Sequence, residues 1–261
     1  MYFISLNKGV NFMQNPPKMS EINFLDDKHY GLYLKGKSKQ TWDVDLDWSR
    51  ATNDDFPDEY KKDAIIVASL SAHVELIGME NAAELMLQST DFSLKIGLAQ
   101  AVNDEARHAE LFARYAIMAN GKILDLSSTR ELYLDHFQKL NTFDELFLSH
   151  VFLENGALEQ FNLFIHAFGE GSLIGQIYKG AMHDEARHVQ MGINYFRQLI
   201  ASDPLKYELV ENHLNTFKKI LQVNPEGIAW LSKISRIPAN DIERRVHARH
   251  DNFINKITEE K

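Results

Sequence analysis

The sequence predicts an all-α protein built around a four-helix bundle, and three observations support this fold class. Long segments rich in helix-forming residues and free of proline alternate with short turn-forming segments. Two of the long segments contain the same pentapeptide, Asp-Glu-Ala-Arg-His. In addition, 44% of the 261 residues are hydrophobic, which is enough for a sizeable core. We therefore expect a single domain over residues 1–261, with further helices around the bundle.

The elements are expected in the following order along the chain. Residues 1–57 mix aromatic, acidic and turn-forming residues without a sustained period, which predicts an N-terminal arm packed on the main body. Residues 58–201 form the four-helix core, with a short helix in the crossover between its two hairpins. Residues 202–261 are expected to form one helix to about residue 222 and then two shorter ones. The four core helices are expected at residues 58–88, 92–119, 143–168 and 173–201.

Turn-forming and capping residues give these boundaries. Ser89–Asp91 supply a turn and an N-cap before the second core helix, and Gly121 follows its end. The sequence Gly-Glu-Gly-Ser at residues 169–172 predicts the turn of the second hairpin. Pro225 and Pro238 divide the C-terminal segment, because proline lacks the backbone N–H that a continuing helix requires.

Charge and composition exclude several classes of protein. With 28 Lys and Arg against 37 Asp and Glu, the formal net charge is −9, and no basic block could follow a phosphate backbone. We therefore expect neither a nucleic acid nor an anionic membrane surface as a partner. The N-terminus lacks the apolar segment of a signal peptide, and no run of about 18 apolar residues occurs, so a soluble, cytoplasmic protein is expected. Since cysteine is absent, any electrons must come from a partner or a diffusible reductant.

The two copies of the pentapeptide begin at residues 104 and 184, and internal repeats of this kind are informative about the fold. Within each copy the Glu and the His stand three residues apart, so both project from one helix face and can bind the same metal ion. The pairs are Glu105 with His108 and Glu185 with His188. One such pair is common on surface helices, whereas two identical copies, each in the second helix of a hairpin, favour a metal site.

Hairpin geometry predicts where further ligands lie, because residues equidistant from a turn between antiparallel helices sit at about the same height. The first turn centres near Thr90, so Glu105 lies level with position 75, which is a glutamate. By the same reasoning Glu185 lies level with position 154, which is also a glutamate. Glu80 and Glu159 are rival carboxylates, but they fall about a turn and a half from this level and rank second.

Six residues are therefore the candidate metal ligands: Glu75, Glu105, His108, Glu154, Glu185 and His188. One Glu from each of two helices and a Glu-x-x-His from each of the other two is the dimetal pattern of four-helix bundles. Mixed oxygen and nitrogen donors suit iron or manganese better than a tetrahedral structural zinc site. The alternative, acids that face water on amphipathic helices, conflicts with the apolar residues on both sides of Glu75 and Glu154.

These motifs resemble the Asp-Glu-x-Arg-His signature of bacterial multicomponent monooxygenase hydroxylases and their relatives in the ferritin-like di-iron carboxylate superfamily. The resemblance covers about residues 65–200. It implies a ferritin-like bundle with two iron ions, manganese being possible at one or both sites, that are bridged by carboxylates and activate O2.

The resemblance also implies that Asp104 and Asp184 hydrogen-bond the ring nitrogen of a ligand histidine on the opposing helix. This role is physically reasonable, because a ligating imidazole usually donates its free N–H to a carboxylate. Arg107 and Arg187 are expected in the same network. The alternative for these four residues is simple surface charge.

The chain also departs from the proteins that it resembles. Leu158 stands where the hydroxylases have a threonine one turn after the third-helix glutamate, and Phe112 stands where the radical-generating subunit of ribonucleotide reductase has a tyrosine, although Tyr115 is nearby. Ala181 replaces the third histidine of the arylamine N-oxygenases. His150, four residues before a predicted ligand, is read as a seventh ligand, a proton donor or a satisfied core histidine.

Small residues near the predicted ligands leave two readings open. Gly78, Gly156 and Ala157 could leave room for a substrate beside the metal ions or could permit close helix packing. The buried phenylalanines expected around them could line a channel, although such residues more often form the core.

The resulting prediction is an oxygenase or oxidase that uses O2, acts on a small apolar or aromatic organic molecule and takes electrons from a ferredoxin or reductase. A homodimer is a possible assembly. The alternatives are a ferroxidase or iron-storage protein, for which Fe(II) is the substrate, and an inactive scaffold, which the complete ligand set disfavours. Ferritins are usually shorter than this chain, so the terminal segments favour an enzyme.

Overall fold

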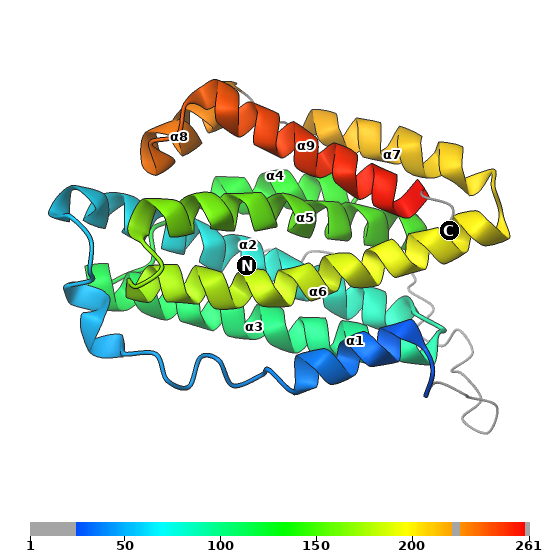
Figure 1. Ribbon diagram of the computed structural model, residues 1–261, viewed down its shortest axis with the longest axis horizontal. Helices are drawn as coiled ribbons and strands as arrows, with labels where there is room; N and C mark the ends of the chain where they lie inside the picture. The colour runs from blue at the N-terminus through cyan, green and yellow to red at the C-terminus, as the bar shows by residue number, and fades with distance from the viewer. Residues whose placement is uncertain (1–24, 221–224, 259–261) are drawn as a thin grey trace, which may run out of the picture.

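The computed structural model describes residues 25–220 and 225–258, which contain helices and no β-strand. Long antiparallel helices form two hairpins, α2 packed along α3 and α5 packed along α6, and contacts between α3 and α6 join the hairpins (Figure 1). The all-α four-helix bundle predicted from the sequence is confirmed. The bundle helices are α2 (Lys61–Gln88), α3 (Phe92–Asn120), α5 (Phe143–Phe168) and α6 (Leu173–Ser202).

Shorter helices cover the outside of the bundle. The helix α1 lies along α3 and α6, whereas α7, α8 and α9 contact α5 on the opposite side of the molecule (Figure 1). The crossover between the hairpins contains α4, as expected. These elements are α1 (Lys28–Lys37), the 3-10 helices η2 (Trp48–Thr52) and η3 (Asp58–Tyr60), α4 (Ser127–Phe137), α7 (Lys206–Ile220), α8 (Pro225–Ser235) and α9 (Ala239–Thr258).

The structure differs from the sequence-based expectation in two terminal segments. The arm contains a regular helix, α1, which begins at the cap Asp27: its carboxylate accepts hydrogen bonds from the backbone N–H groups of His29 (2.7 Å) and Tyr30 (3.4 Å). The last helix, α9, has 20 residues and is longer than the short helix expected. Residues 1–24 of the predicted arm lie outside the described part of the chain.

Local capping fixes where the bundle helices begin and end. Asp91 caps α3 by accepting a hydrogen bond from the backbone N–H of Leu94 (2.6 Å), as predicted. At the start of α5, Thr142 and Glu145 form a reciprocal capping box. Gly121 follows α3 with a φ of 76°, a left-handed conformation that glycine adopts without a steric penalty.

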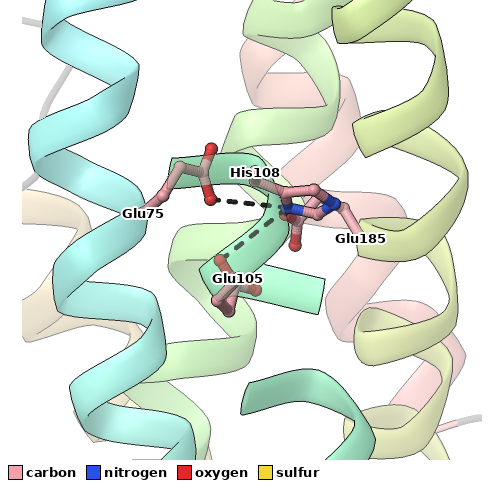
Figure 2. Close-up of side chains that lie close together, drawn as sticks. All are labelled: Glu75, Glu105, His108 and Glu185. Atoms are coloured by element: carbon pink, nitrogen blue, oxygen red, sulfur yellow. Dashed lines mark ion pairs between the residues drawn. The ribbon is translucent and has the colours of Figure 1, made fainter. Parts of the chain in front are cut away.

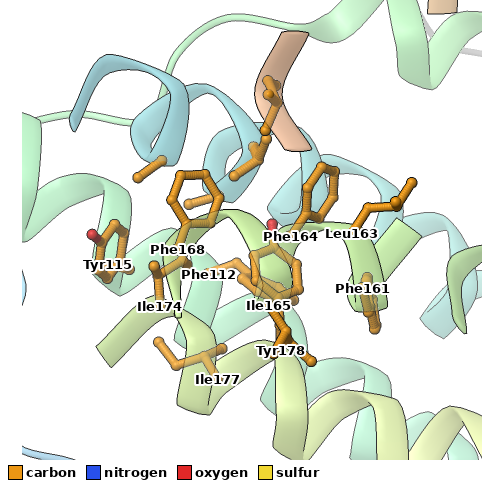
Figure 3. Packing of buried hydrophobic residues seen from close by; sticks show 14 of the residues in the cluster. Phe112, Tyr115, Phe161, Leu163, Phe164, Ile165, Phe168, Ile174, Ile177 and Tyr178 are labelled. Carbon is orange, nitrogen blue, oxygen red and sulfur yellow. The ribbon is translucent and has the colours of Figure 1, made fainter. Parts of the chain in front are cut away.

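Two hydrophobic clusters fill the bundle, one on each side of the predicted metal level. The first, shown in Figure 3, packs Phe112, Phe161 and Phe164 around the buried ring of Tyr178. The second lies toward the other end and includes Phe147. On α2, α3 and α6 the candidate ligands fall between residues of the two clusters, and on α5 Glu154 lies between Phe152 and Leu158 of the second cluster. The polar residues of the site are therefore enclosed by apolar layers, which raise the cost of leaving them unpaired.

The arm is attached to the bundle by a buried carboxylate. Asp54 accepts hydrogen bonds from the backbone N–H groups of Leu173 (2.6 Å) and Ile174 (3.0 Å), so it satisfies the free donors at the start of α6. The hydroxyl of Tyr115 also donates to Asp54, over 3.3 Å. Arm and hairpin are thus held together at this end of the bundle.

Among the described residues, no helix combines the length and the apolar character that crossing a membrane would require.

Candidate metal centre

The structure brings all six candidate ligands together in the middle of the bundle, where each is at most 5% exposed. Glu75 projects from α2 toward Glu105 and His108 of α3 and Glu185 of α6 (Figure 2). The ligand atoms form two overlapping groups, each within 4.8 Å: Glu75, Glu105, His108 and Glu185, and Glu105, Glu154, Glu185 and His188. Their role as metal ligands stays a prediction.

In both groups the Nδ1 atom of a histidine faces the carboxylates. His108 Nδ1 lies 3.2 Å from Glu185 Oε1, 3.6 Å from Glu75 Oε2 and 3.9 Å from Glu105 Oε2. His188 Nδ1 lies 3.2 Å from Glu105 Oε1, 3.2 Å from Glu154 Oε1 and 3.3 Å from Glu185 Oε2. Each histidine therefore approaches a carboxylate of the opposing hairpin as closely as those of its own.

The polar atoms at the centre of the site fit two cations. Among the described residues, four buried atoms of the candidate ligands lack a well-aligned hydrogen-bond partner: Glu105 Oε1, His108 Nδ1, Glu154 Oε2 and Glu185 Oε2. Such atoms are costly in an apolar interior unless something else binds them. Four carboxylates with two imidazoles match the donors that iron and manganese accept, and they exceed what a tetrahedral zinc site requires.

The four carboxylates of the site differ in whether they belong to one or to both of the ligand groups. Glu105 and Glu185 belong to both groups, whereas Glu75 and Glu154 each belong to one. A carboxylate that offers one oxygen to each of two cations acts as a bridge between them. The geometry therefore makes Glu105 and Glu185 the candidate bridging ligands.

Without metal ions, the site would hold an unusual distribution of protons. Burial, together with the negative charges of Glu185 and Glu75, raises the pKa of Glu105 well above its ordinary value. Burial also opposes ionisation of Glu185, but hydrogen bonds from His108 and His188 outweigh it and lower its pKa to about 2. Burial alone would lower the pKa of both histidines, yet the surrounding carboxylates raise the pKa of each well above 6.5.

These shifts predict that the metal-free chain loses stability as the pH rises above 6.5. Each folded-state histidine keeps a proton that the unfolded chain releases near pH 6.5, so this stabilisation is complete below that pH and is lost as the pH rises through the folded-state pKa. The raised pKa of Glu105 acts in the same direction. We expect the melting temperature, measured by circular dichroism with a chelator present, to fall as the pH rises above about 6.5. The His188→Gln variant should show a smaller fall, and an equal fall would contradict the assignment.

A ring of charged residues lies behind the two histidines. The Nε2 atom of His108 lies 3.3 Å from Asp184 Oδ2, and that of His188 lies 3.3 Å from Asp104 Oδ2. Each aspartate thus sits beside the histidine of the opposing hairpin. Burial opposes ionisation of Asp184, but hydrogen bonds and charges from His108, Trp42 and Arg107 hold its pKa well below the ordinary range.

The two arginines of the repeated motif connect these aspartates. Arg107 donates to Asp104 and Asp184, and Arg187 donates to the same two residues, over 2.7 to 2.8 Å in every case. The arginine side chains are only 10% and 11% exposed. This burial indicates that the two arginines and two aspartates form a hydrogen-bonded network and are not simple surface charges. Their role in metal binding stays a prediction.

Sequence reasoning missed a residue of this network, Trp42, which lies in the arm. Its indole Nε1 donates to Asp184 Oδ2 over 2.9 Å, and its ring lies 6.4 Å from that of His108. Gly180 makes room for the indole, since a Cβ atom there would come within 2.2 Å of it. Nothing in the local sequence marks Trp42, because its partners are more than 60 residues away.

The rival carboxylates belong to neither ligand group. Glu80 is exposed on α2. Glu159 is buried, but it faces α9, where Arg245 Nε and Arg249 Nε lie 2.7 and 3.6 Å from its carboxylate oxygens. Its charge is therefore compensated away from the metal level.

His150 lies beside the site without joining either ligand group. Its Nε2 atom is 2.9 Å from Glu154 Oε1, and neither ring nitrogen makes a well-aligned hydrogen bond among the described residues. The three readings of His150, as a seventh ligand, a proton donor or a satisfied core histidine, stay predictions.

A cavity of about 230 Å³ reaches the candidate ligands from the side of α8 and α9. Phe152, Phe161, Phe164 and Trp230 form much of its apolar wall, while His150 and carboxylates of the site contribute polar surface. The two nearby glycines have different surroundings. A Cβ at Gly78 would lie 2.7 Å from Glu105 Oε2, whereas a Cβ at Gly156 would meet nothing within 4 Å. Gly78 thus lies against the Glu105 side chain while also lining the cavity, and open space adjoins Gly156.

Comparisons with known proteins give structural neighbours only. No family model and no curated protein matches the sequence. A variant of an R2-like ligand-binding oxidase with an anaerobically reconstituted Mn/Fe cofactor is similar to this chain with a TM-score of 0.74 and 18% sequence identity, over 94% of this chain and 99% of that chain. A second variant, described with a non-activated Mn/Mn cofactor, gives a TM-score of 0.71 and 19% identity over 89% and 94% of the two chains. The chain therefore has the ferritin-like helical-bundle fold of these oxidases.

Proposed function

We propose that this chain is a di-iron oxidase or oxygenase that activates O2 and acts on a small apolar or aromatic organic molecule with externally supplied electrons. The observation that carries the proposal is the cavity, which brings an apolar space into contact with the candidate ligands Glu75, Glu105, Glu154 and Glu185. The similar oxidases are described with Mn/Fe or Mn/Mn cofactors, so manganese at one or both positions belongs to the same proposal.

The size and lining of the cavity support the substrate class. A dry engineered cavity of about 150 Å³ can hold benzene, so 230 Å³ has room for a molecule of about one ring with a short substituent. The aromatic wall favours an apolar body. His150, whose ring nitrogens make no well-aligned hydrogen bond within the described part of the chain, is the candidate partner for a polar group on that molecule.

When bound, the metal ions would supply O2 chemistry and one-electron steps that no side chain of the chain can supply. The protein contributes position and environment. Glu75, Glu105, His108, Glu154, Glu185 and His188 hold the ions, while Asp104 and Asp184 orient the two histidines. The apolar layers on both sides exclude water, which protects reactive species from side reactions.

Metal content and the reaction with O2 test this function together. We expect about two metal ions per chain after reconstitution with iron, and a transient visible absorbance when the anaerobic ferrous protein is mixed with O2. Oxidation of excess Fe(II) by a large hollow assembly, without binding of organic probes, would instead support the ferroxidase or storage alternative. The absence of stoichiometric metal would refute both functions.

Filling the cavity is expected to abolish ligand binding without loss of metal. In Gly156→Phe, the new ring enters the open space beside Glu154. We expect the affinity for single-ring probes (toluene, phenol and aniline), measured by ligand-observed NMR on the full chain, to fall at least about tenfold. Gly31→Phe is the matched control, because Gly31 is exposed on α1 with nothing within 4 Å of its Cβ position. Equal binding to both variants would show that the cavity is not the substrate site.

A further inference from the structure

A second cluster of potential metal-binding side chains lies where α4, α5 and α7 meet, outside the candidate metal centre. His136 of α4 and His213 of α7 both direct their Nε2 atoms at the hydroxyl of Ser149 on α5, over 3.1 and 2.7 Å. None of the three belongs to the two ligand groups described above. We propose that this His–Ser–His cluster binds one divalent transition-metal ion of the zinc class, which ties α4 and α7 to the bundle helix α5.

The cluster offers three donor atoms in a small enclosed space. Ser149 is 0% exposed and His136 is 6% exposed, whereas His213 is half-buried, so solvent reaches the cluster from its side. The centroids of the two imidazole rings lie 6.4 Å apart, with 43° between the ring planes. Zinc binds imidazole nitrogens at about 2.0–2.1 Å, so rotations of the two rings toward each other bring both Nε2 atoms to one ion. A water molecule beside His213 would complete the coordination.

Both histidines have the charge state that a metal ion requires. Burial is the main cause that lowers the pKa of His136, to about 4, and His213 and Lys139 act in the same direction. Burial also lowers the pKa of His213, although the negative charge of Glu145 opposes it. Each imidazole is therefore neutral at pH 7 and keeps a lone pair for a metal ion.

Hydrogen bonding alone gives a competing account of the cluster. The serine hydroxyl has one proton, so it donates to one histidine and accepts from the other, and the two rings hold different tautomers. A cluster of this kind is satisfied without any ion. If the proton of the donating ring moves from Nε2 to Nδ1, however, both Nε2 atoms become available and the protein loses no proton. Metal binding therefore distinguishes the two accounts.

The donor set favours a different kind of ion from the one expected in the candidate metal centre. Imidazole suits zinc, copper and nickel, whereas iron and manganese also accept the carboxylates that dominate the other site. Glu145 lies four residues before Ser149 on α5, and its negative charge, which acts on His213, complements a divalent cation. The same ion would also fix one wall of the cavity, because Tyr133 of α4 lines it.

Zinc binding to the iron-loaded full chain tests the site. The chain is dialysed against about 10 µM free zinc, a concentration that detects micromolar affinity, and elemental analysis counts iron and zinc separately. Zinc that merely replaces iron is thereby recognised. We expect one zinc ion per chain in addition to the metal ions of the centre. In His213→Gln, an amide keeps a hydrogen-bonding group beside Ser149 but is a poor zinc ligand, so the affinity should fall at least about tenfold.

The matched control is the double variant His166→Ala/His247→Ala, which removes two exposed histidines outside the cluster. It should keep the additional zinc ion, and circular dichroism checks that each variant folds. If the unmodified chain takes up no additional zinc, or if His213→Gln takes up as much, the proposal is overturned and the cluster is only hydrogen-bonded.

Hydrogen exchange followed by mass spectrometry shows where the ion binds. Zinc should slow amide exchange in α4 and α7 of the unmodified chain, because an ion held by both helices opposes their local opening. In His213→Gln the same zinc should leave exchange in these helices unchanged. Slower exchange confined to α2, α3 and α6 would mean that zinc binds in the candidate metal centre instead, which would also overturn the proposal.

The zinc site and the proposed function can fail independently. If the chain binds no stoichiometric iron, the proposed function fails, and the comparison of the unmodified chain with His213→Gln still decides whether the cluster binds zinc. If the chain binds iron and reacts with O2 but both chains take up equal zinc, the zinc site is wrong and the proposed function stands.

Discussion

Glu105→Ala is expected to weaken metal binding at both positions of the centre, whereas Glu75→Ala weakens it at one. The reason is that Glu105 belongs to both ligand groups and Glu75 to only one. Changes behind the ligands of metalloproteins already cost about 10- to 100-fold in affinity, so removing a shared ligand should cost at least about 100-fold at each position. Metal analysis of the folded chain after reconstitution with stoichiometric iron should find about two ions in the unmodified protein, about one in Glu75→Ala and fewer than one in Glu105→Ala.

The matched control for this prediction is Glu80→Ala, because Glu80 lies on the same helix as Glu75 but is exposed and outside both groups. It should retain about two ions. Circular dichroism checks that each variant folds. Two ions bound to Glu105→Ala would mean that the ligand assignment is wrong, and one ion would favour a terminal role for Glu105 over a bridging one.

Asp184→Ala is expected to destabilise the whole chain and to weaken metal binding. The Asp184 carboxylate is 5% exposed and accepts hydrogen bonds from Arg107 (2.7 Å), Arg187 (2.8 Å) and Trp42 (2.9 Å). Its removal leaves two poorly solvated guanidinium groups with less compensating charge, a change that typically costs about 3–5 kcal/mol. Since 1 kcal/mol corresponds to about 2–4 °C for a chain of about this size, we expect the melting temperature to fall by at least about 6 °C.

Metal affinity should fall in the same variant by about 10- to 100-fold, because His108 loses the carboxylate that orients its ring. The control is Asp58→Ala, which removes an exposed carboxylate paired with Lys61 and should leave the melting temperature nearly unchanged. Thermal melts of the metal-free chains and metal titrations measure both effects. If Asp184→Ala melts within about 2 °C of Asp58→Ala, the buried charge network does not contribute as proposed.

The sequence was sufficient to predict the parts of the structure that follow from regular geometry. Helix rise and two well-marked turns fix which residues of a hairpin face one another, and the structure has Glu75 and Glu154 at the level of the repeated motif. The turn residues are local signals as well, as the Asp91 cap and the left-handed Gly121 show. Local signals of this kind do not depend on the rest of the fold.

Features that depend on distant contacts could not be predicted. Trp42 reaches Asp184 from 142 positions away in the sequence, and only the space above Gly180 admits its indole. The helix α1 was missed because its few turns lack a clear apolar period, although its cap Asp27 was visible. The cavity depends on how α8 and α9 lie over α5, so Gly156 could not be distinguished from Gly78 in the sequence.

The contact of each aspartate with the histidine of the opposite hairpin has a consequence for the origin of the chain. Each hairpin supplies one lone Glu and one Glu-x-x-His, and each aspartate supports the histidine of the other hairpin. Two copies of a single hairpin, related by a twofold axis, would therefore contain every ligand of the centre. This arrangement is what duplication and fusion of an ancestral half-length gene would produce. The two halves are not identical: His150 precedes Glu154 by four residues, whereas Ser71 precedes Glu75 by the same interval. The two metal positions therefore have unequal neighbours and need not prefer the same ion.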